Sequence, residues 1–510
     1  MSNENDQETT ANGKDKEKEK KEEKPTPKDN LVTTQQSIII HGRELKYTVT
    51  TGTIVLKEED DKEGHKPKAE VFFTAYTKDD VDDPHTRPLT FSFNGGPGSS
   101  SVWLHLGVLG PRRVPVSEGD GTEQLPPPYR VVDNEFTLLE DTDLVFIDPI
   151  ATGYSRMIAG EKVNPNEYHT YKKDIESVGE FIRLYTTRYK RWSSPKFLIG
   201  ESYGTTRAAG LSGYLQDRHG LFLNGIMLVS SIINFQTARF NHGNDMPYIL
   251  FLPTYAASAW YHGRLDAKYQ SMTLETFLDE VEEFAATEYT LALMEGQRLD
   301  EVERAHIIER LAAYTGLSWR YLERTNLRIN IHRFVKELLR DEGYTIGRFD
   351  SRIRGRDRDE VGENHEHDPS FDIVHGVYTA CFNDYVRSEL AFESDLPYEI
   401  LSFNVFPKWR YDNFENQYVN SAETLREAMT RNPFLKVFVG NGYYDLATPY
   451  FATEYTFDHL GLKPELQANV SMAYYGAGHM MYVHPESLAK LSADLKAFMS
   501  TAVSGSGESA

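Results

Sequence analysis

Alternation of apolar and polar residues begins at Ser37. The stretch 37–56, SIIIHGRELKYTVTTGTIVL, alternates in the manner of an antiparallel hairpin or meander. AEVFFTAY (69–76) and PLTFSFN (88–94) have the same strand character, and the second runs into a cluster of glycines. The first folded part of the chain is therefore predicted to be a set of β-strands.

Farther along the chain, short apolar runs alternate with helical periodicity. DLVFID (143–148), KFLIG (196–200) and GIMLVSSI (225–232) are runs of the kind found in buried parallel strands. Residues 171–189 carry apolar side chains at helical spacing. Strands alternating with helices predict an α/β fold with a mainly parallel central sheet.

The pattern changes between residues 234 and 404, where charged segments with helical periodicity predominate. LETFLDEVEEFAATEYTLALM (274–294) is an amphipathic helix by this criterion. Strand patterning returns in FLKVFVG (434–440). We therefore expect a split core with a mostly helical cap inserted into it. The predicted parts are a first core segment over 31–233, the cap over 234–404 and a second core segment over 405–503.

The two ends of the chain differ in composition from the rest. Residues 1–30 have almost no apolar side chains and alternate Lys with Glu, so a disordered charged tail is predicted. Residues 504–510 form a second short tail. The N-terminal segment lacks the apolar stretch of a secretory signal, and the sequence has one cysteine, Cys381. Unless a leader has been removed, these features predict a cytoplasmic location without disulfides.

Net charge narrows the classes of partner. The 510 residues carry a formal net charge of −22, which phosphate backbones and anionic membranes would repel. No apolar stretch reaches the length of a membrane span. We therefore expect neither nucleic acid nor membrane as a partner, and the sequence leaves the oligomeric state open.

A nucleophile motif follows the strand KFLIG. Gly200-Glu201-Ser202-Tyr203-Gly204 matches G-x-S-x-G, and a helical stretch of small residues comes next. Two glycines permit the tight strand-to-helix turn that exposes a serine hydroxyl. Such a hydroxyl needs a base to take its proton. Ser202 is the predicted nucleophile.

The acid and the base should come from loops after later strands, in that order. Asp445 follows the strand FLKVFVG, and His479 follows NVSMAYYG with a glycine on each side of Ala477. Asp445 alone would also suit a turn or a helix cap. Together with Ser202, the two residues form a predicted Ser–His–Asp triad.

The oxyanion hole needs two backbone N–H donors. The residue after the nucleophile, Tyr203, should supply one. Consecutive glycines in Asn94-Gly95-Gly96-Pro97-Gly98 follow the strand PLTFSF and let an amide approach closely, so Gly96 is the predicted second donor. A structural turn would also explain this loop, whereas a phosphate loop would need a lysine that is absent here.

In combination, these residues resemble the serine carboxypeptidase family. The resemblance rests on several motifs spread over most of the chain after residue 40: NGGPGSSS (94–101), LGP (109–111), GESYG (200–204), NGYYDLATP (441–449) and GAGHMMYVHP (476–485). It implies an α/β-hydrolase fold and peptide hydrolysis from the C-terminus through an acyl-enzyme. It further implies that Asn94, Gly95 and Glu201 hold the substrate's terminal carboxylate and that Met480 lines the pocket for the last residue. No cofactor or metal is implied.

Two positions depart from the family's pattern. A glutamate and a tryptophan of the family's carboxylate site are replaced by Val108 and Ser92. Without a second carboxyl, Glu201 lacks the partner with which it would share a proton. We expect altered carboxylate recognition and a pH optimum less acidic than is usual for the family. If its segment is helical, His105 lies one turn before Val108 and is placed to approach Glu201.

Two other interpretations follow from these departures. An esterase or acyltransferase could use the same acyl-enzyme, and a binding protein without activity could act through its tail and cap. His365-Glu366-His367-Asp368 contains metal-ligand types but lies in a polar stretch, so a solvated loop is predicted there rather than a metal site.

Overall fold

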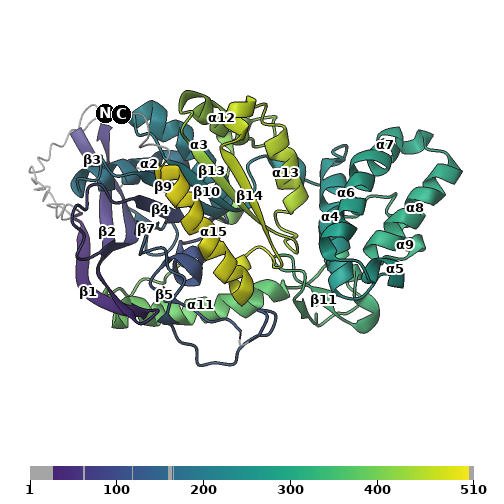
Figure 1. Cartoon of the computed structure of the whole chain (residues 1–510), viewed down its shortest axis with the longest axis horizontal. Coiled ribbons are helices and arrows are strands. Elements are labelled where there is room, and N and C mark those ends of the chain that lie inside the picture. The colour runs from purple at the N-terminus through teal and green to yellow at the C-terminus, as the bar shows by residue number, and fades with distance from the viewer. Residues whose placement is uncertain (1–26, 61–63, 118, 159–163, 165, 505–510) are drawn as a thin grey trace, which may run out of the picture.

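The computed structural model describes residues 27–60, 64–117, 119–158, 164 and 166–504, and a central β-sheet organises them (Figure 1). Ten strands of the described residues pair in this sheet: β1 (Asn30–Ile40), β2 (Arg43–Asp60), β3 (Gly64–Lys78), β4 (Leu89–Phe93), β7 (Asp143–Ile147), β8 (Arg156–Met157), β9 (Lys196–Ser202), β10 (Gly225–Ser231), β13 (Lys436–Gly442) and β14 (Val470–Tyr475).

The sheet has an antiparallel edge and a parallel centre. Its order is β1-β2-β3-β7-β4-β9-β10-β13-β14, and β8 pairs with β3. Pairing is antiparallel from β1 to β7 and parallel from β7 through β14. The predicted N-terminal meander and the predicted mainly parallel sheet are therefore confirmed.

Helices cover both faces of the sheet. Successive side chains of a strand point to opposite faces, so each face carries its own apolar cluster. Phe197 and Ile199 of β9 belong to one core cluster, and Leu198 between them belongs to the other. The first cluster includes side chains of the π-helix η1 (His105–Leu109), α11 (Pro369–Ser388) and α15 (Pro485–Ser504). The second includes side chains of α2 (Tyr171–Arg188), α3 (Tyr203–His219) and α12 (Ala422–Arg431).

Helix α2 confirms the helix that the apolar spacing of residues 171–189 predicts. It begins at an N-cap, Thr170, whose Oγ1 accepts a hydrogen bond from Lys173 N at 3.2 Å. Ile175, Phe181 and Ile182 are buried on the side of the sheet. The apolar stripe therefore fixes which face of the helix packs, as its spacing predicts.

The segment between β10 and β13 contains a separate helical bundle, which lies at one end of the molecule in Figure 1. Its side chains form a third core cluster, which also includes Tyr450 and Ala452 of α13 (Tyr450–Asp458). The bundle contains α4 (Met246–Tyr261), α5 (Ala267–Gln270), α6 (Leu274–Phe284), α7 (Thr290–Glu295), α8 (Glu301–Thr315), α9 (Trp319–Arg324) and α10 (Ile331–Glu337).

The predicted cap boundaries, 234 and 404, stay a prediction. Within that span, α11 packs in the first core cluster through Val377 and Tyr378 rather than in the third. Of the predicted N-terminal tail, residues 1–26 lie outside the described part, and β1 begins at Asn30. The predicted second tail lies outside it beyond Ser504. Of the helices that the structure describes, none has the length and apolar character needed to cross a membrane.

Candidate active site

Ser202 lies on the turn between β9 and α3. Its φ of 60° is in the left-handed region, which residues other than glycine rarely adopt. A Cβ on Gly204 would lie 2.8 Å from Phe93 O, and one on Gly200 would lie 2.2 Å from Gly204 O. The glycines of G-x-S-x-G therefore permit this close approach of strand, helix and neighbouring strand.

Asp445 and His479 follow neighbouring parallel strands, and their side chains meet. His479 Nδ1 lies 2.7 Å from Asp445 Oδ2, and both residues are buried. Asp445 Oδ1 accepts from the backbone N–H groups of Ala447 and Thr448 at 2.8 and 3.0 Å, and Thr448 Oγ1 donates to Oδ2 at 2.7 Å. This carboxylate can accept a hydrogen bond from Nδ1–H of the imidazole. The other ring nitrogen, Nε2, can then accept a proton.

Strand β10 connects the serine turn to the histidine loop. Ser231 pairs with Ser202 in the sheet register, beside an irregularity at Ser230. Ser230 Oγ donates to His479 O at 2.6 Å. In the described part of the chain Ser202 Oγ forms no hydrogen bond to His479, a contact that is often loose before substrate binds.

A short segment from the insert braces the histidine loop. His479 N donates to Phe349 O at 2.5 Å, and Gly478 N donates to Asp350 Oδ2 at 3.1 Å. The Phe349 ring centroid lies 5.0 Å from that of His479. Asp350 is itself paired with the buried Arg352 at 2.7 Å. The insert thus contributes directly to the position of the imidazole.

The glycine loop after β4 lies against the nucleophile turn. A Cβ on Gly95 would lie 2.5 Å from Tyr203 N and 2.9 Å from Ser202 Cβ, so only glycine fits there. The next residue, Gly96, has a φ of 101°. Asn94 O accepts from Arg207 Nη1 at 2.6 Å, which ties the start of the loop to α3.

Glu201 is a buried carboxyl beside the nucleophile, with 4% of its surface exposed. Its Oε2 accepts a hydrogen bond from Tyr482 Oη at 2.6 Å. Burial raises the pKa of Glu201 to about 7, although His479, the Tyr482 hydroxyl and the Asn94 side chain act in the opposite direction. The carboxyl therefore exchanges its proton near neutral pH.

The expectation that His105 approaches Glu201 is wrong. His105 Nε2 lies 2.6 Å from Tyr76 Oη, and its ring stacks on Phe146 with a centroid distance of 4.1 Å. The segment is a π-helix with a hydrogen bond from Gly110 N to His105 O, so α-helical spacing does not apply. Burial lowers the pKa of His105 to about 3, which keeps it neutral.

The two departures from the family pattern lie in the interior. Val108 is fully buried in the first core cluster. Ser92 is also buried, and among the described residues its Oγ has no hydrogen-bond partner. Met480, the predicted pocket residue, is half-buried against the same cluster as Val108. In the described residues, no group of three or more His, Cys, Asp or Glu side chains could hold a metal ion.

Sequence reasoning missed several residues that contact the predicted site, among them Ser230 of β10. Thr448 could have been found, because a threonine three residues after an aspartate at a strand end is typical of a side-chain-capped turn. The others each contact a site residue that is distant in sequence, so no local pattern predicts the contact. They include Phe349 from the insert, Arg207 from α3 and Tyr482 from the loop after β14.

The mainly parallel sheet, the serine on a strand-to-helix turn and the later acid and histidine define an α/β-hydrolase fold. Comparison with known proteins narrows this class. A model of the serine carboxypeptidase family matches residues 61–507. The chain therefore belongs to the serine carboxypeptidase family.

Individual relatives are distant. The pheromone-processing carboxypeptidase KEX1 of Saccharomyces cerevisiae is 32% identical over 158 residues, 30% of this chain and 20% of the relative. Serine carboxypeptidase-like 33 of Arabidopsis thaliana is 27% identical over 160 residues, 29% of this chain and 28% of the relative. These matches thus span less than a third of each relative's length.

A solved structure extends the likeness in fold. The crystal structure of a prohormone-processing carboxypeptidase from Saccharomyces cerevisiae aligns with a TM-score of 0.56. The alignment covers 89% of this chain and 91% of the other at 15% identity. At that identity, the comparison concerns the fold alone.

Proposed function

We propose that this protein is a serine carboxypeptidase that releases C-terminal residues from peptides through an acyl-enzyme on Ser202. The observation that carries the proposal is the 2.7 Å hydrogen bond from His479 Nδ1 to the buried Asp445, in a loop tied to the Ser202 strand through Ser230. Membership of the serine carboxypeptidase family supports it independently.

The proposed reaction assigns one task to each residue. Ser202 Oγ attacks the carbonyl carbon of the last peptide bond while His479 Nε2 takes its proton. Asp445 stabilises the imidazolium that forms, and the imidazolium then passes its proton to the leaving amine. The backbone amides of Gly96 and Tyr203 hold the oxyanion. His479 then deprotonates a water molecule that attacks the acyl carbon, and it returns the proton to Ser202 Oγ as the ester bond breaks.

Substrate recognition is assigned to the groups around Glu201. In this proposal Asn94, Gly95 and Glu201 hold the terminal carboxylate, and Met480 borders the pocket for the departing residue. A pKa of about 7 for Glu201 supports a pH optimum less acidic than is usual for the family. A neutral carboxyl can donate a hydrogen bond to a carboxylate, whereas an ionised one would repel it.

An esterase or acyltransferase is the second candidate. The observation that favours it is Val108, a fully buried apolar residue where the family resemblance implies a second carboxyl. Loss of that group would weaken selection for a free C-terminus and leave the acyl-transfer chemistry unchanged.

The deciding experiment is mass spectrometry of a peptide pool incubated with the protein and with Ser202→Ala. We expect shortening from the C-terminus only, slowed by about 10⁴-fold or more in the variant. Peptides with amidated C-termini should be poorer substrates than their free acids. Intact peptides together with Ser202-dependent hydrolysis of simple esters would overturn the carboxypeptidase proposal in favour of the esterase.

A cytoplasmic location is part of the same proposal. It is supported by the composition, because the one cysteine of the sequence, Cys381, is buried and unpaired. Cell fractionation should recover the Ser202-dependent activity with soluble cytoplasmic markers, and recovery from the medium or the cell envelope would contradict this.

A further inference from the structure

Tyr482 is the hydrogen-bonding partner of Glu201, although 281 positions separate them. It lies in a short helix, η8 (Met481–Val483), three residues after His479. Both side chains are buried, with exposed fractions of 3% for Tyr482 and 4% for Glu201. A contact of 2.6 Å between a phenol and a carboxyl oxygen is a strong, directional hydrogen bond.

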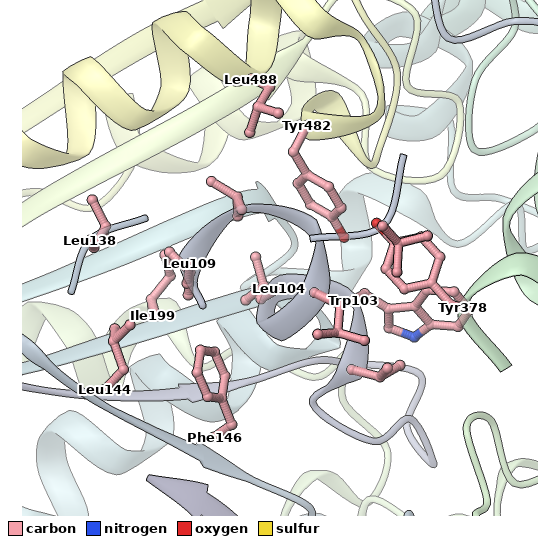
Figure 2. Close-up of a cluster of buried hydrophobic side chains, with 14 of the residues drawn as sticks. Trp103, Leu104, Leu109, Leu138, Leu144, Phe146, Ile199, Tyr378, Tyr482 and Leu488 are labelled. Carbon is pink, nitrogen blue, oxygen red and sulfur yellow. The ribbon is translucent and has the colours of Figure 1, made fainter. Parts of the chain in front are cut away.

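The neighbouring backbone is shaped to accept this tyrosine. A Cβ on Gly107 would lie 2.4 Å from Cε2 of Tyr482 and 3.0 Å from the hydroxyl of Tyr378. Any residue other than glycine would therefore displace the Tyr482 ring. Figure 2 shows Tyr482 close to Tyr378, and the ring centroid of Tyr378 lies 5.0 Å from that of Trp103. Gly107 immediately precedes Val108, where the family resemblance implies a carboxyl.

This inference rests on the proposed function. We propose that Tyr482 is a positioning residue for substrate recognition, whose hydroxyl holds one oxygen of Glu201 and leaves the other to receive the terminal carboxylate of the peptide. A phenol thus replaces the missing second carboxyl as the group that orients Glu201. The substrate carboxylate is bound only while the free oxygen of Glu201 carries a proton.

The chemistry of the pair follows from its neighbours. The groups that face Glu201 are His479, Asp445, Asn94, Tyr482 and Tyr378. Burial raises the pKa of Tyr482 far above its ordinary value, so the phenol stays protonated at every working pH. Tyr482 therefore always donates, and Glu201 alone gains or loses a proton. Since the hydroxyl lowers the pKa of Glu201, removal of the hydroxyl should raise that pKa.

The test is steady-state kinetics of Tyr482→Phe from about pH 5 to pH 9, with a peptide acid and its C-terminal amide. At the acidic end we expect KM for the acid to rise roughly fivefold to tenfold, with kcat nearly unchanged. The alkaline rise in KM should move upward by about one pH unit. Kinetics with the amide should stay as in the unmutated protein, because it has no carboxylate for Glu201.

Tyr378→Phe is the matched control. It removes a buried hydroxyl beside the same glycine, but within the described residues that hydroxyl forms no hydrogen bond to Glu201. Its pH profile should match that of the unmutated protein. An equal shift in both variants, or no change of KM and pH profile in Tyr482→Phe, would overturn the inference.

A second variant keeps the test decisive if Tyr482→Phe does not fold. Tyr482→3,5-difluorotyrosine keeps the ring and makes the hydroxyl a stronger donor, so the alkaline limb should move to lower pH. An unchanged limb would contradict the inference even if Tyr482→Phe does not fold. Failure of the proposed function would look different, because the unmutated protein would then not release C-terminal residues or would not prefer acids over amides.

Discussion

Two buried carboxyl groups flank the nucleophile turn, and their partners differ in kind. On the α2–α3 side, Asp174 Oδ2 accepts from Arg207 Nε at 2.8 Å and from Tyr203 Oη at 3.2 Å. On the η1–α11 side, Glu201 accepts from Tyr482, which carries no charge. One carboxyl is thus paired with a permanent cation, and the other with a neutral donor.

This difference separates a carboxyl held by a permanent cation from one held by a neutral hydroxyl. Burial raises the pKa of Asp174, but the guanidinium of Arg207 and the Tyr203 hydroxyl oppose that effect. Arg207 also donates to Asn94 O and lies over the rings of Phe93 and Tyr203 at 5.3 and 5.2 Å. Arg207, whose guanidinium stays protonated in proteins, therefore ties the start of the glycine loop to α3. Glu201, whose pKa is about 7, changes its charge within the working range.

The largest expected effect comes from breaking the ion pair. Arg207→Met should destabilise the fold by about 3–5 kcal/mol, because it leaves the Asp174 charge buried without a cation beside it. Urea unfolding followed by fluorescence measures the change. Arg207 has no exposed surface, so solvent cannot replace the guanidinium. The released Asn94 carbonyl should also lower kcat/KM of the variant that remains folded.

Two further variants test whether the unpaired charge of Asp174 causes the loss of stability in Arg207→Met. Arg207→Met combined with Asp174→Asn removes both charges and should recover most of the lost stability. Arg183→Met removes an arginine from the partly exposed pair with Glu180 and should cost about 0.5 kcal/mol or less. A cost for Arg207→Met as small as that of Arg183→Met would mean that Asp174 needs no cation.

The sequence predicts the backbone of this site better than its buried polar contacts. The strand-to-helix turn at Ser202 and the loops of Asp445 and His479 carry local signals, because glycines and strand ends dictate where such side chains can lie. Each signal is contained within a few residues. The same holds for α2, whose apolar stripe and Thr170 cap fix its limits.

Contacts between distant segments have no such signal. Arg207 lies in TTRAAGL and resembles an ordinary helical arginine until the fold places it beside Asp174, 33 residues earlier. Phe349 reaches His479 from an insert whose position no periodicity specifies. His105 misled the prediction because a π-helix turns fewer degrees per residue than the α-helix that the spacing assumes. Tertiary packing, rather than propensity, decides all three.

The next largest effect concerns the titrating carboxyl. A group whose folded-state pKa is raised from 4.5 to about 7 binds more protons in the folded state between those values. Stability should therefore fall as pH rises across this window, by about 3 kcal/mol in total. Glu201→Gln should remove this dependence, so its stability relative to the unmutated protein should increase progressively from pH 4.5 to about 7 and stay constant above that. Urea midpoints at acidic and alkaline pH measure it.

The control for this prediction is an exposed carboxyl. Glu465 is exposed on a short helix, and Glu465→Gln should leave the pH dependence of the midpoint unchanged. If Glu201→Gln and the unmutated protein keep the same difference in stability at every pH, Glu201 has the same charge throughout. The contrast with Asp174 would then be lost.

The smallest effect compares the two tyrosines. Tyr203→Phe removes a 3.2 Å hydrogen bond from a carboxyl that keeps Arg207, so we expect a cost of about 1 kcal/mol or less. Tyr482→Phe removes a 2.6 Å bond from Glu201, and its cost at pH 8 should exceed that of Tyr203→Phe because no cation remains at hydrogen-bond distance. Near pH 5, where Glu201 is protonated, the two costs should converge. Urea unfolding of both variants at the two pH values measures this, and a larger cost for Tyr203→Phe at pH 8 would reverse the roles assigned to the two carboxyls.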